Sequence, residues 1–187
     1  RRGARADEQV PGSGLGLAVA YGVVQRHAEM QVLHIWGADL WDGGWCHCAD
    51  CAGVSVQDQN LRVCNAVAAA LASAGLPQSV CYLAYHDTIE PDLRLRPHHN
   101  VVAEFAPREV NPRYRQAFER HVELFGGRMR VFEYYGDAIL FCGIAVPLGE
   151  VIAADLAYYH RAGAREISFL QFGAYSLWAH PTNFHAF

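Results

Sequence analysis

A regular alternation of apolar runs and helical segments constrains the fold of this chain more than any other feature. Five short apolar runs are typical of buried strands, and they cover residues 32–36, 79–85, 101–106, 130–135 and 166–172. Three segments with helical spacing of apolar residues lie between them, at 58–74, 113–125 and 149–162. Strands that are separated by helices favour parallel pairing with right-handed crossovers. The sequence therefore predicts an α/β fold.

Polar and aromatic residues gather where the predicted strands end. They are Asp39, then Tyr85, His86 and Asp87, then Arg108, then Glu133, Tyr135 and Asp137, and finally Gln171. Polar residues at the end of every strand are typical of the active-site face of β/α barrels. An open doubly wound sheet rarely has such residues after all of its strands. Five strands do not close an eight-stranded barrel. We therefore expect residues 31–187 to form the C-terminal part of a TIM-type barrel, with the missing strands supplied by another segment or chain.

Residues 1–30 differ from the rest. A polar, glycine-rich stretch precedes a predicted helix at 15–30, and we expect this segment to be loose and foreign to the barrel. Residues 12–27, which begin Gly-Ser-Gly-Leu-Gly-Leu, resemble the last glycine box and following helix of the histidine-kinase ATPase domain. The Asn-bearing helix and the Asp-x-Gly-x-Gly turn of that family are missing from this chain. An ATPase remnant is therefore a minor alternative.

Composition excludes several classes of partner. The chain has 187 residues, 52% hydrophobic and 18% charged, with a net charge of -4. All 15 basic residues are Arg, and their scattered positions give no phosphate-binding stripe, so we expect no nucleic-acid partner. No apolar run reaches 18 residues, so we expect no membrane span. Of six Cys residues three are clustered, and the other three, which we expect to be buried, favour a reducing compartment such as the cytoplasm.

The clustered cysteines follow the pattern Cys46-x-Cys48-x2-Cys51. Three thiolates so close together can wrap one borderline cation, and zinc prefers four such ligands in a tetrahedron. His47, His86 or another Cys could supply the fourth ligand. We expect a structural zinc that braces the loop, and the alternative is a set of three reduced thiols.

Carboxylates at the strand ends suggest acid–base chemistry. Cleavage of a glycosidic bond usually needs two carboxyl groups about 5–10 Å apart, one protonated and one ionised. The candidates are Asp39, Asp87, Glu104, Glu109, Glu133 and Asp137. Asp39 and Glu133 form the preferred catalytic pair because each lies among Trp or Tyr residues, which raise the pKa of a carboxyl. Each carboxylate has the alternative role of a solvated loop residue or an Arg partner.

Aromatic residues near the same strand ends point to a sugar ligand, because the CH faces of sugar rings stack on aromatic side chains. Trp41 and Trp45, beside glycines, are the predicted platforms, whereas we expect Trp36 to lie in the core. The predicted substrate-binding residues are Trp41, Trp45, Tyr85, His86, Asp87, Arg108, Tyr135, Asp137 and Gln171.

An ordered set of motifs extends from residue 32 to the end of the chain. It includes the Trp36-Gly-Ala-Asp39 strand end, the cysteine cluster, Cys64-Asn65, Leu83-Ala84-Tyr85, Glu133-Tyr134-Tyr135 and Asp155-Leu156. This set resembles the family known as domain of unknown function 4838, whose members look like glycoside hydrolases related to the alpha-glucuronidase and beta-hexosaminidase barrels.

The resemblance implies a β/α barrel, a polysaccharide substrate and glycosidase activity. Leu40 follows Asp39 where the beta-hexosaminidase group has Asp-Glu, which puts the substrate-assisted mechanism of that group in doubt. A non-catalytic carbohydrate-binding barrel with a structural zinc knuckle is the alternative from another class of protein.

Overall fold

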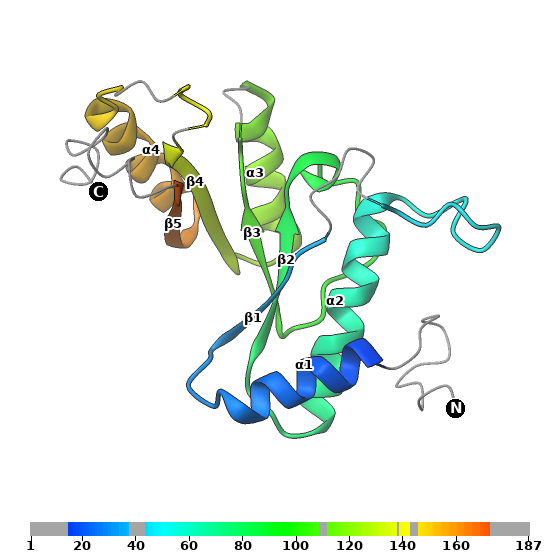
Figure 1. The fold of residues 1–187 in the computed structure, drawn as a ribbon. Coiled ribbons are helices and arrows are strands. Elements are labelled where there is room, and N and C mark those ends of the chain that lie inside the picture. Colours follow the sequence, from blue (N-terminus) through cyan, green and yellow to red (C-terminus); the bar gives the residue numbers. More distant parts are fainter. Residues whose placement is uncertain (1–14, 38–43, 109–111, 138, 143–145, 173–187) are drawn as a thin grey trace. The chain divides into compact units, whose positions relative to one another are not determined.

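The computed structural model describes residues 15–37, 44–108, 112–137, 139–142 and 146–172 (Figure 1). Helices and strands follow the chain as α1 (Leu15–Arg26), β1 (Val32–Ile35), α2 (Val56–Ser73), β2 (Ser79–Ala84), the 3-10 helix η1 (His86–Thr88), β3 (Val101–Phe105), α3 (Pro112–Leu124), β4 (Met129–Asp137), α4 (Gly149–Ala162) and β5 (Ala164–Phe172). The strand order in the sheet is β1-β2-β3-β4-β5, and β1 pairs with β2, and β4 with β5, in parallel. The predicted α/β class with five strands is confirmed, and the TIM-type barrel stays a prediction.

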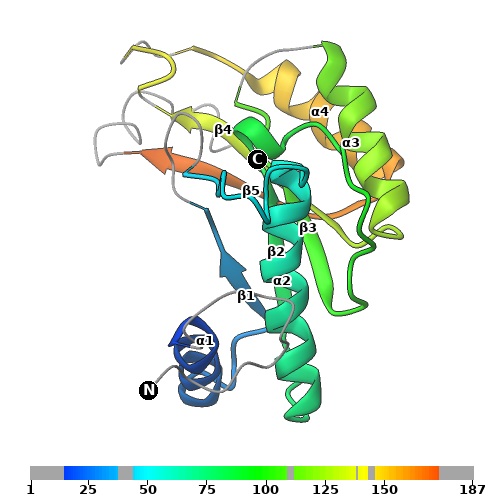
Figure 2. The same ribbon diagram turned by 90° about the vertical axis from the view of Figure 1, so that its right-hand side faces the viewer.

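The chain divides into two compact units, Arg1–Ala103 and Glu104–Phe187. In the first unit α2 packs against β2, and α1 packs beside α2 (Figures 1 and 2). The apolar positions of α2 recur every three or four residues, so they form one face that β2 can cover. The buried side chains of this layer are Leu61, Cys64, Ala68 and Leu71 from α2 and Val80, Cys81 and Tyr82 from β2.

Side-chain caps fix the N-terminal end of α2. The Ser55 hydroxyl accepts a hydrogen bond from the backbone N–H of Asp58 at 3.1 Å and donates one to the carbonyl of Asp92 at 3.0 Å. The Asp58 carboxylate accepts the backbone N–H groups of Arg94 and Leu95, both at 3.0 Å. The first bond satisfies a donor at the helix end, and the other three anchor the loop that follows η1 to the same helix end.

The second unit is built from the end of β3 and from α3, β4, α4 and β5. Its core is aromatic: the ring of Phe118 on α3 lies 5.4 Å from that of Phe105 and 5.2 Å from that of Tyr159 on α4. Helix α4 ends at Gly163, whose φ of 111° is accessible to glycine and strained for other residues. A Cβ at this position would also lie 3.2 Å from Val122, so this glycine allows β5 to begin close to α3.

Two predictions about burial are wrong. Trp36 is 51% exposed, because it follows β1 on the same face as the exposed His34, while Leu33 points into the core. Cys142 is exposed in the segment after β4, whereas Cys64 and Cys81 are buried as expected. Among the described residues no helix combines the length and the apolar character that a membrane crossing requires. Asp39, Trp41, Glu109 and residues 1–14 lie outside the described residues.

We expect Ser55→Ala to lower the free energy of unfolding by about 1–2 kcal/mol, because it removes the cap of α2 and leaves the Asp92 carbonyl without this donor. Urea denaturation followed by circular dichroism measures the change. Ser73→Ala, an exposed substitution in the last turn of the same helix, is the control and should change stability by less than about 0.5 kcal/mol. Equal midpoints for the two variants would contradict the assigned role of Ser55.

Candidate functional site

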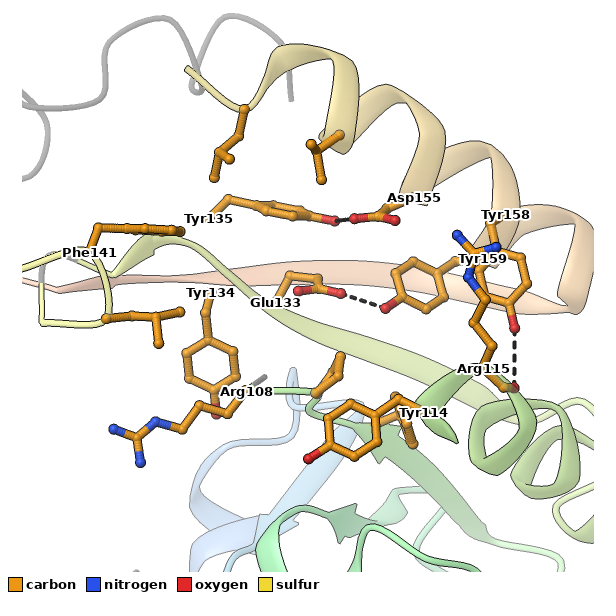
Figure 3. Close-up of a pocket in the computed structure, with 15 residues that line it drawn as sticks. Arg108, Tyr114, Arg115, Glu133, Tyr134, Tyr135, Phe141, Asp155, Tyr158 and Tyr159 are labelled. Atoms are coloured by element: carbon orange, nitrogen blue, oxygen red, sulfur yellow. Dashed lines mark hydrogen bonds between the residues drawn. The ribbon is translucent and has the colours of Figure 1, made fainter. Parts of the chain in front are cut away.

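The second unit contains a pocket of about 320 Å³ (Figure 3). Its walls come from β4, from α4, from the first turn of α3 and from the segments that follow β3 and β4. A volume of this size is near the lower end of the range for small-ligand sites in proteins. The polar side chains that line it include Arg108, Glu133, Tyr135, Asp155 and Tyr159.

Four of these residues form two hydrogen-bonded pairs between β4 and α4. The Tyr159 hydroxyl donates to Glu133 Oε1 at 2.5 Å, and the Tyr135 hydroxyl donates to Asp155 Oδ2 at 3.0 Å (Figure 3). Residues two apart on a strand share a face and lie about 6.7 Å apart along it. Residues four apart on a helix share a face and lie about 6 Å apart along the axis. The two spacings match, so a tyrosine on each element meets a carboxylate on the other.

Glu133 is the most perturbed carboxyl group of this site. Its pKa is raised to about 7, chiefly by burial and also by the charge of Asp155, while the hydrogen bond from Tyr159 opposes the increase. Only 8% of the residue is exposed. A carboxyl with this pKa is partly protonated at neutral pH, so Glu133 can donate a proton there or accept one.

The tyrosines stay protonated. Burial, together with the charge of Glu133, holds the pKa of Tyr159 and that of Tyr135 well above the usual range. Each therefore remains a hydrogen-bond donor at any physiological pH and fixes the position of one carboxylate oxygen. The pocket thus presents two oriented carboxyl groups from two different elements.

Aromatic and basic side chains complete the walls. The guanidinium of Arg115 lies 4.7 Å from the centre of the Tyr158 ring, in the geometry of a cation–π contact. Figure 3 shows Tyr134, Arg108 and Tyr114 on the other side of Glu133 from Tyr135. The walls of the pocket therefore combine aromatic rings with charged groups.

A β-bulge helps to place these residues. Glu133 is paired with Phe169 of β5, but Gly136 is paired with Gln171, so β4 uses one residue more than β5 over this interval. An extra residue turns the local side chains and is common next to active sites. The bulge lies beside Glu133, Tyr134 and Tyr135, which all line the pocket.

A second polar cluster lies at the end of β2, in the first unit. The indole N–H of Trp45 donates to Asp87 Oδ2 at 3.0 Å, and the rings of Tyr85 and His86 meet edge to face with centres 4.0 Å apart. The backbone of His86 has a φ of 48°, in the left-handed region that is costly for a residue other than glycine. Four of the predicted substrate-binding residues are therefore brought to one strand end.

Three cysteines of the first unit form a group that could hold a metal ion. The Sγ atoms of Cys46, Cys48 and Cys51 all lie within 4.8 Å of one another. The Cys51 thiol shares hydrogen bonds with Cys46 and Cys48, which raises its pKa to about 11, while hydrogen bonding with Cys46 lowers the pKa of Cys48. Neither His47 nor His86 belongs to this group within the described part of the chain.

The remaining predicted residues have separate surroundings. Asp137 accepts the backbone N–H groups of Ile139 and Leu140 at 2.8 and 3.2 Å, an arrangement that shapes a turn. Glu104 is buried, with Oε1 4.0 Å from Nε of Arg130. Gln171 lies in β5, opposite Gly136. Asp39 and Trp41 lie outside the described residues, so the pair of Asp39 with Glu133 stays a prediction.

Sequence reasoning overlooked Asp155 and Tyr159 as parts of a site. Their spacing of four residues on a predicted helix was the available signal, because it puts a carboxylate and a phenol on one face. What the spacing does not reveal is that this face meets β4.

The raised pKa of Glu133 predicts a specific dependence of stability on pH. Between its ordinary pKa of 4.5 and its folded pKa of about 7, the native state keeps a proton that the unfolded chain has released. Stability therefore falls as the pH rises through this window, by about 3 kcal/mol when the effect is complete. We expect Glu133→Gln to lack this decline, so that its stability relative to the parent increases from about pH 4 to about pH 8. Denaturant titrations across the range test this, with the exposed Glu123→Gln as control; parallel curves for Glu133→Gln and the parent protein would contradict it.

Comparison of the chain with protein-family models, with curated proteins and with solved structures gives no match. The resemblance to domain of unknown function 4838 and the two alternatives to it therefore stay predictions from sequence motifs. The structure contributes the pocket of the second unit and, in the first unit, the polar cluster after β2 and the cysteine group. The function is inferred from the chemistry of these side chains.

Proposed function

We propose that the protein hydrolyses a glycosidic bond in the pocket of the second unit, with Glu133 as the proton donor. The observation that carries this proposal is the buried Glu133 carboxyl, with a pKa near 7, in a pocket that also holds a second carboxylate. A general acid for this reaction must be protonated while its partner is ionised. Different environments for two nearby carboxyl groups meet that requirement.

Asp155 is the proposed second carboxylate. It lines the same pocket, it is less buried than Glu133, and its charge raises the pKa of Glu133. The hydrogen bond from Tyr135 to Oδ2 orients this carboxylate in the pocket. Asp39, the partner preferred from the sequence, remains the other candidate for this role.

In the proposed reaction Glu133 donates its proton to the glycosidic oxygen as the bond to the anomeric carbon breaks. Asp155 stabilises the positive charge that develops on the sugar and activates the attacking water or attacks directly. Tyr159 and Tyr135 hold the two carboxyl groups in position and do not exchange protons themselves. The rings of Tyr114 and Tyr134 supply faces on which the sugar can stack.

We expect Glu133→Gln to lower kcat by at least about 100-fold, because removal of a general acid typically costs this much. The loss should be larger for alkyl glycosides than for 4-nitrophenyl glycosides, since nitrophenolate leaves without protonation. In the parent protein kcat/KM should decline above about pH 7, where free Glu133 ionises. The assay uses a panel of both glycoside types, with Asp155→Asn as the second active-site variant.

Two controls separate chemistry from folding. Glu123→Gln, an exposed change on α3, should leave all rates unchanged. Equal decreases in kcat on alkyl and nitrophenyl glycosides would show that Glu133 is not the general acid. Undiminished hydrolysis by Glu133→Gln would contradict the proposed glycosidase mechanism. Sugar binding without any hydrolysis by the parent protein would support the alternative function, a carbohydrate-binding barrel with a zinc knuckle.

We also propose zinc as the ion of the cysteine group. Thiolates bind zinc at about 2.3 Å, and three of them on one short loop form most of a tetrahedral shell. Cys48 and Cys51 form a tight turn, in which the N–H of Cys51 donates to the carbonyl of Cys48 at 2.9 Å. The ion would have a structural role, because all members of the group among the described residues are cysteines.

We expect purified protein to contain about one zinc per chain, and Cys51→Ser to lower this to less than about half, because loss of one of three thiolates weakens the site strongly. Elemental analysis after gel filtration measures the content. Cys142→Ser, which removes an exposed thiol of the other unit, is the matched control and should retain full zinc. Equal zinc contents in the two variants would contradict the assignment.

A further inference from the structure

Trp45 links the cysteine group to the end of β2. It directly precedes Cys46, its indole N–H bonds to the Asp87 carboxylate at 3.0 Å, and Cη2 at the far edge of its ring lies 3.7 Å from where a Cβ on Gly37 would be. Gly37 follows β1, and Asp87 follows β2. One side chain therefore spans the ends of two neighbouring strands in the first unit.

Two glutamines at the start of α2 hold both ends of this link. The Gln59 side chain accepts the backbone N–H of Cys46 at 2.9 Å and donates to the carbonyl of Cys46 at 3.1 Å. The Gln57 side chain, which is buried, donates to the carbonyl of Asp87 at 3.0 Å. The backbone on each side of the Trp45–Asp87 bond is thus tied to one capped helix end.

The cysteine loop itself has fewer constraints. It projects from the N-terminal end of α2 (Figure 1), and Cys46 and Cys48 are exposed. The N–H of Cys51 bonds to the carbonyl of Cys48, and the N–H of Val54 bonds to that of Cys51, which shapes the turn. Gln59 connects the end of this turn to Cys46, because its Nε2 donates to the carbonyl of Val54 at 3.3 Å and to that of Cys46 at 3.1 Å. A shared ion would add a direct connection through the side chains, because Cys46 and the Cys48–Cys51 turn would bind the same centre.

We propose that ion binding by Cys46, Cys48 and Cys51 controls the Trp45–Asp87 hydrogen bond and, through it, the conformation of the end of β2. This inference rests on the proposed zinc site and extends it. The ion fixes the residue next to Trp45, Trp45 fixes the Asp87 side chain, and Gln57 fixes the Asp87 backbone. His86 lies between this anchor and β2 in a left-handed conformation, which persists only where its surroundings impose it.

The coupling has a chemical consequence for the strand end. Tyr85, His86 and Asp87 are predicted to contact substrate, and Trp45 is a predicted sugar platform. Because the hydrogen bond between Trp45 and Asp87 joins two side chains in an exposed position, a modest constraint on either residue changes the population of the bonded state. The ion therefore acts as a structural switch for the residues at the end of β2 and does not itself contact the substrate.

The test follows the indole N–H of Trp45 in protein labelled with 15N-tryptophan. The resonance is assigned by its loss in Trp45→Phe. Addition of one equivalent of zinc to chelator-treated protein should shift this resonance and slow the exchange of its hydrogen by about 10-fold, because the bonded state becomes more populated. The other indole resonances serve as internal references.

Three variants resolve the possible outcomes. Cys51→Ser should abolish the response, Cys142→Ser should keep it, and Asp87→Ala should bind zinc fully while its Trp45 indole stays in fast exchange. Stoichiometric zinc binding with an unchanged Trp45 resonance would overturn the coupling and leave the zinc site intact. Failure to bind zinc would overturn both, and the chelation experiment on the parent protein gives this answer even if a cysteine variant does not fold.

Discussion

The hydrogen bond between the Tyr159 hydroxyl and the Glu133 carboxyl is the interaction on which the second unit depends most. A carboxyl that is 8% exposed needs a partner, since burial without one costs several kcal/mol. Tyr159 supplies it from α4, at 2.5 Å, and so fixes the rotation of that helix against β4. Once this rotation is set, Asp155 lies one turn earlier on the same face and meets Tyr135. The position of the Asp155 carboxylate is therefore a consequence of the hydrogen bond that Tyr159 donates to Glu133.

The first unit uses the end of one helix in a comparable way. Side chains at residues 55 to 59 bond to three separate segments: the cysteine loop, the residues after β2 and the loop near Asp92. The contacted residues of these segments lie in loops or in the short 3-10 helix η1, where backbone polar groups need side-chain partners. Gathering those partners on one capped helix turn makes the segments mechanically dependent on one another. For this reason a change at the thiols can reach Asp87 across 36 or more residues of sequence.

Local patterns predicted the elements well, and long-range pairings poorly. Helix α4 was predicted with its observed limits because Gly163 must end it, and the strands were predicted to within two residues because each coincides with an apolar run. Glu133 was found because a carboxylate among aromatics is visible in the sequence itself. Its partner Tyr159 is 26 residues away, and Trp45 and Asp87 are 42 apart, so these contacts depend on helix rotation and on a bulge that no local pattern encodes. The misplacement of Trp36 has the same origin: its aromatic character favoured the core, but the register of β1 turned it outward.

The two tyrosine–carboxylate pairs allow a structural and a catalytic interpretation, and the raised pKa of Glu133 fits the proposed catalytic one. A pair that served packing alone would be about as stable if apolar groups of similar volume replaced it. Ionisation of Glu133, with its pKa of about 7, instead lowers the free energy of unfolding near neutral pH. A residue that served only the packing of the core would gain nothing from such a pKa. The cost falls on a residue that lines a pocket, beside a bulge, opposite a second carboxylate. A local loss of stability at a residue with a perturbed pKa is typical of functional sites. The rest of the fold supplies enough stability to tolerate it.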